Sequence, residues 1–163
     1  MKIIGIDPGL SGAIAVLKNN KVLNIFDIPV MSEGKKNKRQ LNSALLVNLL
    51  KENINKEEEV AVVVEQVNAM PGQGVTSMFN FGQTFGALKG ICAALELPIF
   101  FVRPSKWKKH FELINSSKDA SRTKAIEMYP KLSNQLSKKK DVNKSDAILI
   151  ARFFSETRLK EEN

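Results

Sequence analysis

The sequence predicts a single α/β domain in which helices flank a five-stranded mixed sheet, and three observations lead to this prediction. Short apolar runs alternate with longer stretches whose apolar residues recur at helical spacing, which is the pattern of an α/β chain. The first three apolar runs are joined by turns too short for a crossover, so they predict an antiparallel meander. The run V-A-V-V-V-E-Q at 60–66 is apolar without alternation, which is typical of a strand buried on both faces.

The predicted elements follow from these patterns in chain order. Strands are expected at 2–6, 13–17, 22–27, 60–66 and 99–102. Helices are expected at 39–54, at 75–95, from Pro104 onward, from the N-cap Ser116-Ser117 to Met128, and at 144–158. Segments 29–38 and 131–144 are expected to be basic loops. The first strand would lie between the second and the fourth, which gives the sheet order 3-2-1-4-5, with residues 1–158 in one domain and 159–163 as a frayed tail.

The composition is that of a basic globular protein. Of the 163 residues, 43% are hydrophobic and 26% are charged, and the formal net charge is +8 with a pI of about 9.6. This balance favours a polyanionic partner, with nucleic acid first and an anionic membrane surface second. The single Cys92 and the single His110 exclude an internal disulfide framework and a zinc cluster. There is no signal pattern, no apolar run of membrane-spanning length and no free basic amphipathic helix, so we expect a cytoplasmic protein without a membrane partner.

Three carboxylates lie where a metal site is expected. Asp7 ends the first strand and Glu65 ends the fourth; as ends of parallel neighbours, they would meet at one edge of the sheet, on strands about 4.8 Å apart. Asp146 begins the last helix and could face the same edge. Taken singly, Glu65 is a residue emerging into solvent and Asp146 is an N-terminal partner of the helix dipole. Together the three predict an oxygen-only cage for two Mg²⁺ ions, with Mn²⁺ as a substitute.

Five motifs carry a resemblance to a known family. In chain order they are I-I-G-I-D-P-G-L-S-G, V-V-V-E-Q, V-R-P-S-K-W-K-K, S-S-K-D-A-S-R-T-K-A and K-K-D-x-x-x-S-D-A-I-L-I-A. They span nearly the whole chain and resemble the RuvC family of Holliday junction resolvases, closest to its phage-type and plant chloroplast branch. The resemblance implies an RNase H-like fold and a metal-dependent endonuclease that resolves four-way DNA junctions by paired symmetric incisions with two metal ions. It also implies a homodimer, and it leaves a branch-migration motor open as a further partner.

The resemblance assigns the metal ligands residue by residue. Asp7, Glu65 and Asp146 match the metal-binding acids of the family. The fourth ligand has two candidates, because the bacterial spacing points to Asn143 and the phage and chloroplast spacing to Asp141. We expect Asp141, since two divalent ions are better balanced by a fourth anion. This choice requires the last helix to begin at or after Asn143, which leaves Asp141 free to turn toward the sheet edge.

The resemblance predicts two lysines near the cleaved phosphate, and the basic charge of the chain predicts a wider DNA-binding surface. Lys108 and Lys118 match these family lysines; Lys118 is expected to be catalytic, whereas an ordinary solvated surface charge is the alternative for Lys108. Residues expected on the DNA-binding surface are Met70, Phe79, Arg103, Lys106, Lys108, Lys109, Arg122, Lys124, Lys138, Lys139 and Lys140. Met70 and Phe79 are apolar residues that could insert at the junction centre. Trp107 is expected to pack between a helix and the sheet.

Glycines recur every fourth residue in the helix at 75–95. Gly82, Gly86 and Gly90 therefore share one stripe, which is expected to be the dimer interface; packing on the sheet of the same chain is the alternative. A two-fold dimer would present two sites to opposite strands of a four-way junction. The alternative to a nuclease is an RNase H-like module that binds branched DNA without cutting it, although such a module has no use for carboxylates placed against phosphates.

Overall fold

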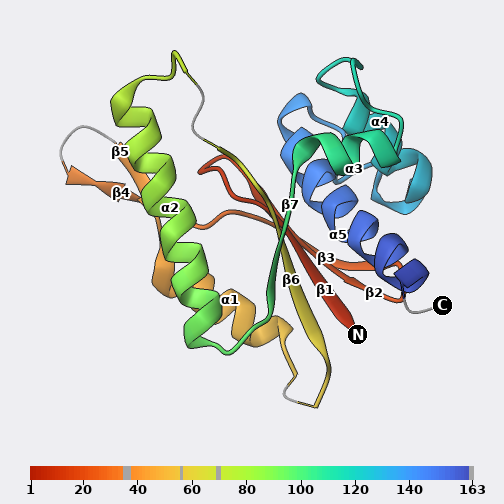
Figure 1. Ribbon diagram of the computed structural model, residues 1–163, viewed down its shortest axis with the longest axis horizontal. Helices are drawn as coiled ribbons and strands as arrows, with labels where there is room; N and C mark the ends of the chain where they lie inside the picture. The colour runs from red at the N-terminus through yellow and green to blue at the C-terminus, as the bar shows by residue number, and fades with distance from the viewer. Residues whose placement is uncertain (35–37, 56, 69–70, 162–163) are drawn as a thin grey trace.

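The structure is a computed structural model that describes residues 1–34, 38–55, 57–68 and 71–161 (Figure 1). The strands are β1 (Lys2–Asp7), β2 (Ala13–Lys18), β3 (Lys21–Asp27), β4 (Val30–Glu33), β5 (Lys38–Leu41), β6 (Val60–Glu65) and β7 (Ile99–Val102). The helices are α1 (Ser43–Asn53), α2 (Val75–Ala94), α3 (Pro104–His110), α4 (Ala120–Met128) and α5 (Val142–Glu161), with 3₁₀ turns at Pro130–Leu132 and Lys139–Asp141. Within these ranges, no helix combines the length and the apolar character that a membrane span requires.

Five strands form one mixed sheet in the order β3-β2-β1-β6-β7. β1, β2 and β3 are an antiparallel meander, whereas β6 is parallel to both β1 and β7. β6 and β7 take the places of the predicted fourth and fifth strands, so the predicted order 3-2-1-4-5 is confirmed. The central position of β1 is what brings the ends of β1 and β6 side by side.

Helices cover both faces of the sheet (Figure 1). On one face, α1 and α2 pack on strand residues such as Ile4 and Val62. On the other face, α3, α4 and α5 pack on residues such as Ile3 and Val63. Successive residues of a strand point to opposite faces, so a strand covered on both sides is apolar at every position. This explains why the run at 60–64 shows no alternation.

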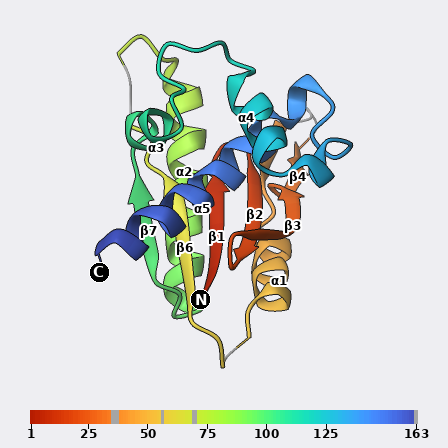
Figure 2. The same ribbon diagram turned by 90° about the vertical axis from the view of Figure 1, so that its right-hand side faces the viewer.

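The helix α5 crosses the sheet over β1 (Figure 2). Gly5 of β1 permits the close approach, because a Cβ at this position would collide with the carbonyl oxygen of Ala147 and with the Cβ of Ala151. Small residues on both elements therefore set how deeply α5 lies on the sheet. Asp146 directly precedes Ala147, so the same contact carries Asp146 to the end of β1.

The segment between β3 and α1 differs from the prediction. The sequence predicts a basic loop at 29–38, whereas β4 and β5 form a two-stranded sheet in which Ser32 lies opposite Arg39. Their sequences, V-M-S-E and K-R-Q-L, lack an alternating apolar pattern, so only their pairing defines them as strands. The helix α1 correspondingly begins at Ser43, after Asn42, whose side chain accepts a backbone hydrogen bond of 3.0 Å in the first turn.

Candidate active site

Two acidic side chains end neighbouring parallel strands. β1 and β6 run in register as far as Ile6 opposite Val64, and the next residue of each strand is an acid, Asp7 in β1 and Glu65 in β6. The apolar residues before them are buried, and both acids are only partly exposed. The carboxylates therefore lie together at one edge of the sheet, where the buried strands end.

The third acid comes from α5. Asp146 lies over the end of β1 because its neighbour Ala147 packs on Gly5. The charge of Asp146 raises the pKa of Asp7 and that of Glu65. The three acids therefore form one electrostatic cluster, although they come from three elements.

Burial dominates the ionisation of this cluster. It raises the pKa of Asp7 to about 7, and the charges of Glu65 and Asp146 add to the effect. Burial also raises the pKa of Glu65 and that of Asp146 above their ordinary values. The hydrogen bond from the Gly9 N–H and the ammonium of Lys108 lower the pKa of Asp7, but they do not outweigh burial. Asp7 is therefore partly protonated near neutral pH unless an added cation neutralises the cluster.

Trp107 holds the carboxylate of Glu65. The indole of Trp107 is fully buried under α3, and its Nε1–H donates a hydrogen bond to Glu65 Oε1 at 2.9 Å. This donor lowers the pKa of Glu65 against the larger effect of burial. The predicted packing of Trp107 between helix and sheet is confirmed by its place in the core, and the hydrogen bond adds a second role.

Lys108 faces the acidic cluster from the same helix. Its charge lowers the pKa of each of the three acids. Lys108 also lines a pocket of about 170 Å³ beside Asp146, together with Lys118 and Asn143. Two ammonium groups and one amide therefore border the accessible side of Asp146.

The donor set suits a hard divalent cation. All three acids offer only oxygen ligands, which Mg²⁺ and Mn²⁺ prefer. Asp146 Oδ1 is buried and has no hydrogen-bond partner in the described part of the chain, so it is available to a ligand. In their present rotamers, no three His, Cys, Asp or Glu side chains of the described residues are gathered closely enough to hold a metal ion. Like charges repel without a cation, so side-chain rotation is needed to bring the oxygens together.

Asp141 lies apart from this cluster, contrary to the expectation that it completes a metal cage. The 3₁₀ turn at Lys139–Asp141 leads directly into α5, which begins at Val142. The Asp141 carboxylate accepts the Lys138 N–H at 2.9 Å and binds the Lys144 ammonium at 3.3 Å. Burial acts to raise the pKa of Asp141, but these contacts hold it below its usual value. The early helix start thus turns Asp141 into a capping residue.

Asn143 lies on the side of α5 that faces the acids. Its Nδ2 donates a hydrogen bond of 2.5 Å to the carbonyl oxygen of Ser11, in the loop that follows Asp7. It lines the same small pocket as Asp146, which lies one helical turn further on. Asn143 is thus the candidate that lies beside Asp146, and the identity of the fourth ligand stays a prediction.

The predicted DNA-binding cations divide into free and engaged side chains. Arg122 binds the Asp119 carboxylate through two hydrogen bonds of 2.7 Å. The same guanidinium donates to the carbonyls of Leu136 and Ser137 at 3.0 and 3.2 Å, so Arg122 holds a loop instead of presenting its charge outward. Lys124 pairs with a glutamate one turn later at 3.4 Å. The exposed members of the set are Arg103, Lys106, Lys109, Lys138, Lys139 and Lys140, whereas Lys108 is partly buried. Lys118, which is predicted to be catalytic, is exposed as well.

The two apolar residues predicted to probe the junction centre differ in what can be said of them. Phe79 lies near the start of α2 and is 65% exposed, which is unusual for a large apolar side chain. Met70 lies outside the described residues. The prediction for Phe79 is therefore compatible with its position in the fold.

The glycine stripe of α2 faces away from the sheet. Gly82, Gly86 and Gly90 are exposed, and a Cβ at each would meet no atom of the described chain within 4 Å. Leu88 and Cys92 lie on the opposite side of the helix, where they pack on the sheet. Packing of the stripe on its own sheet, the alternative to a dimer interface, is therefore excluded for the described residues.

Some residues of the site escape sequence reasoning. Ser121 is buried and hydrogen-bonds to Asp146, and it lies in a motif that the family resemblance already contained. Ser11 accepts a hydrogen bond from Arg39 at 3.3 Å, and it too lies in a motif, the one that opens the chain. No sequence signal points to Arg39, because its strand β5 is not predicted.

Comparison with known proteins gives the fold. No protein-family model matches the sequence, and no curated protein does. Thermus thermophilus RuvC in complex with a Holliday junction substrate is similar in structure, with a TM-score of 0.64 and 17% identity over 98% of this chain and 96% of that one. Two further similar structures are T. thermophilus RuvC (TM-score 0.56, 19% identity, 97% of each chain) and the fowlpox virus Holliday junction resolvase (0.51, 16%, 100% of each). The chain thus has the RNase H-like fold of RuvC.

Proposed function

We propose that this protein is a metal-dependent endonuclease that cuts branched DNA, with the four-way junction as its substrate. The observation that carries the proposal is the cluster of Asp7, Glu65 and Asp146, three carboxylates whose pKa values are raised and which include an oxygen without a partner. In a protein that only bound DNA, carboxylates facing the phosphates would lower the affinity for DNA. The fold supports the same class, because solved structures with a similar fold include RuvC in complex with a Holliday junction substrate and the Holliday junction resolvase of fowlpox virus.

Asp7, Glu65 and Asp146 would hold Mg²⁺ or Mn²⁺, with Asn143 as an uncharged fourth ligand. Two bound ions supply an activated water and stabilise the leaving oxygen of a phosphodiester. The protein itself orients the ligands. Trp107 hydrogen-bonds to the Glu65 carboxylate, and the buried Ser121 hydrogen-bonds to the Asp146 carboxylate. These donors hold Glu65 and Asp146 at the edge of the sheet, while the rotation that gathers the carboxylate oxygens would accompany cation binding.

Lys108 and Lys118 would act on the phosphate. The charge of Lys108 lowers the pKa of each acid, which supports a place for this lysine beside the bound phosphate. Lys118 is exposed and lines the pocket next to Asp146, so it can approach the non-bridging oxygens of a bound phosphate. A cation in this place lowers the repulsion between phosphate and carboxylates, and it stabilises the charge that develops during cleavage.

A homodimer through α2 would place two sites on one junction. The outward stripe of Gly82, Gly86 and Gly90 supports this part of the proposal, because bare backbone lets two helices approach closely. A two-fold dimer has the symmetry of a four-way junction, so paired symmetric incisions follow from its geometry. Phe79, exposed near the start of the same helix, would then lie near the junction centre.

Cleavage of synthetic DNA tests the proposal. A labelled four-way junction and a linear duplex of the same length are incubated with the protein in Mg²⁺ or in EDTA, and the products are separated on a denaturing gel. We expect cuts in the junction alone, at symmetric positions, and only with Mg²⁺. Retention of the junction without cutting in Mg²⁺ or Mn²⁺ would establish the non-cleaving binding module instead, and equal cutting of the linear duplex would refute selectivity for branched DNA.

A further inference from the structure

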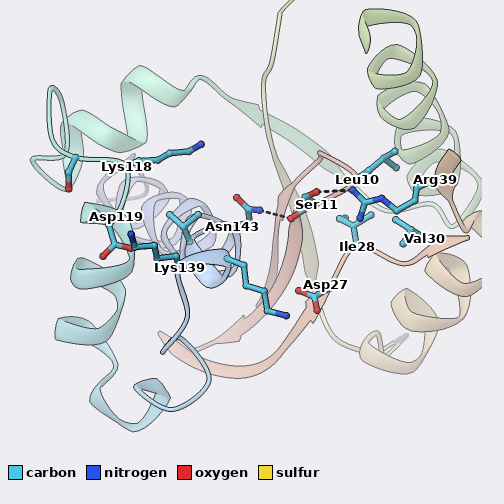
Figure 3. A pocket seen from close by; sticks show the side chains of 14 residues that line it. Leu10, Ser11, Asp27, Ile28, Val30, Arg39, Lys118, Asp119, Lys139 and Asn143 are labelled. Atoms are coloured by element: carbon cyan, nitrogen blue, oxygen red, sulfur yellow. Dashed lines mark hydrogen bonds between the residues drawn. The ribbon is translucent and has the colours of Figure 1, made fainter. Parts of the chain in front are cut away.

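A cleft of about 900 Å³ lies on the side of the β4–β5 sheet (Figure 3) and adjoins the small pocket that contains Asp146. One wall carries Arg39 of β5 and Val30 of β4, and the other carries Lys118 and Lys139. Ser11 lies between the two walls, in the loop that follows Asp7. The cleft is thus built from segments at opposite ends of the chain, and the wall formed by β4 and β5 is the part of the fold that the sequence did not predict.

The charges of the cleft are arranged for an anion. Arg39, Lys118, Lys139 and Lys140 line it, and in the described part of the chain none of these four makes an ion pair within 4 Å. The two acids of the lining are already neutralised by cations from elsewhere: Asp119 binds Arg122 at 2.7 Å, and Asp27 binds Lys144 at 3.5 Å. The surplus of free positive charge therefore lies on both walls.

The wall that carries Arg39 is partly apolar. Leu10, Ile28 and Val30 contribute to the lining beside Arg39 (Figure 3). A lining that combines free cations with apolar surface fits a sugar–phosphate chain, whose charged phosphates are separated by largely apolar sugars. A small free anion would use the cations and leave this apolar surface without a role.

The cleft opens toward the site of chemistry. It shares Ser117, Lys118, Val142 and Asn143 with the smaller pocket beside Asp146. A chain lying in the cleft would therefore pass Lys118 and Asn143 on its way to the carboxylates. Ser11 connects the two walls, because it accepts a hydrogen bond from Arg39 at 3.3 Å and, through its carbonyl oxygen, one from Asn143.

We infer that this cleft binds the phosphodiester backbone of one DNA strand next to the cleaved bond, and that Arg39 is a phosphate contact on its outer wall. The inference rests on the proposed function, because it takes the acids at the end of the cleft as the place of cleavage. In this inference the β4–β5 sheet forms one wall of a cleft that binds a DNA strand. The basic segment around Lys139, before α5, forms the opposite wall.

The test is the salt dependence of DNA binding, measured by fluorescence anisotropy in EDTA so that no strand is cut. Each phosphate contact contributes about 0.9 to the slope of log affinity against log salt for duplex DNA. We expect Arg39→Gln to flatten the slope for a four-way junction by about one contact, and to weaken binding about five- to tenfold near 0.1 M salt. Arg39→Lys keeps the charge and should restore the slope.

Lys21→Gln is the matched control. Lys21 is an exposed cation that begins β3, at the end of that strand opposite to Asp27, so the variant removes one charge far from the cleft. It should leave the slope unchanged. If Arg39→Gln leaves the slope unchanged as well, while the wild type still binds and cuts junctions, the cleft assignment is overturned and the proposed function stands.

Two other results separate the inference from the proposed function. If the wild type binds the junction with the predicted Arg39 effect but never cuts in Mg²⁺, the cleft is supported and the nuclease proposal fails. If the wild type shows no salt-dependent binding of any DNA, both fail together. Circular dichroism of the Arg39 variants checks the fold, and since Arg39 is exposed on a two-stranded sheet, we expect all of them to remain folded.

Discussion

Asp141 and Asp146 lie five residues apart at the start of α5, and the same side chain has opposite properties at the two positions. Asp141 is 4% exposed and satisfied by a backbone N–H and the Lys144 ammonium, which hold its pKa below the usual value against the effect of burial. Asp146 carries a buried oxygen that no donor of the described chain reaches, and burial raises its pKa. Five residues along a helix turn a side chain to a different side, which separates the two environments.

These two environments distinguish a structural carboxylate from one that is available for chemistry. A carboxylate whose oxygens already accept hydrogen bonds stabilises the fold and has no oxygen left to bind a ligand. A buried carboxylate that lacks hydrogen-bond partners lowers the stability of the fold. Such residues are typical of functional sites. Asp7 belongs with Asp146 by this criterion, because its pKa lies near 7 and other acids surround it.

The largest expected effect is on cleavage. Asp146→Asn, Asp7→Asn and Glu65→Gln should each reduce the single-turnover rate at least ~100-fold, because each removes an anionic ligand of the proposed site. Junction affinity in EDTA should stay the same or rise, since a carboxylate facing phosphate is removed. A gel assay in Mg²⁺ gives the rate and anisotropy gives the affinity. Near wild-type cleavage by any one variant would remove that acid from the site.

Ionisation gives the second prediction, for the metal-free protein. Folded Asp7 keeps its proton up to about pH 7, whereas the unfolded chain releases it near 3.8, so raising the pH through this window destabilises the wild type. Asp7→Asn should therefore increase the free energy of unfolding at pH 8 by roughly 2–4 kcal/mol, and change it little near pH 4. Urea titrations in EDTA at both pH values measure this. Equal effects at both would contradict a buried, protonated Asp7.

Added Mg²⁺ sharpens the same comparison. A cation that binds the folded state raises its melting temperature, and it should do so for the wild type and not for Asp7→Asn or Asp146→Asn. The Asp141→Asn protein should respond to Mg²⁺ like the wild type, because its carboxylate is engaged elsewhere. This readout reports metal binding independently of cleavage.

The positions of the two strand-end acids could be predicted from the sequence, whereas the contacts of Asp141 could not. Asp7 and Glu65 follow from one physical rule, that parallel neighbours end at the same edge, once the apolar runs fix which strands pair. The contacts of Asp141 arise at the start of α5, where the Lys138 N–H and the Lys144 ammonium engage its carboxylate. Spacing alone does not reveal local capping contacts of this kind.

The β4–β5 sheet and the Trp107 hydrogen bond illustrate two further limits. β4 and β5 have no apolar periodicity, so their strand character arises only from pairing with each other. Trp107 could be placed in the core from its apolar surface, but which acceptor its N–H meets depends on how α3 lies on the sheet. Contacts between residues far apart in the chain depend on the tertiary structure, so the local sequence pattern does not predict them.

Trp107→Phe is expected to have a smaller effect than loss of an acid. The phenyl ring keeps most of the buried surface and removes only the donor to Glu65, so the protein should fold while Glu65 is less well oriented. We expect about tenfold weaker Mg²⁺ binding, measured by thermal shift, and cleavage that recovers at high Mg²⁺. Phe111→Leu, in the same core cluster, is the control: it should lower stability without changing the Mg²⁺ dependence. Identical Mg²⁺ curves for Trp107→Phe and the wild type would reduce Trp107 to a packing residue.

The smallest effect is expected at Asp141, and it should be on stability. Asp141→Asn loses the charge that binds Lys144 and weakens the cap on the Lys138 N–H, which should cost about 1–2 kcal/mol at pH 7. Because the folded pKa of Asp141 is depressed, this stabilisation is present above the unfolded pKa and is lost as acid protonates the folded carboxylate, so wild type and variant should converge at low pH. The cleavage rate should change by less than about tenfold, since a substitution remote from the acids removes no contact to the reacting phosphate. A loss of ~100-fold or more with little change in stability would mean that Asp141 swings into the site when metal and DNA bind, and the separation of the two aspartates would then hold only for the metal-free protein.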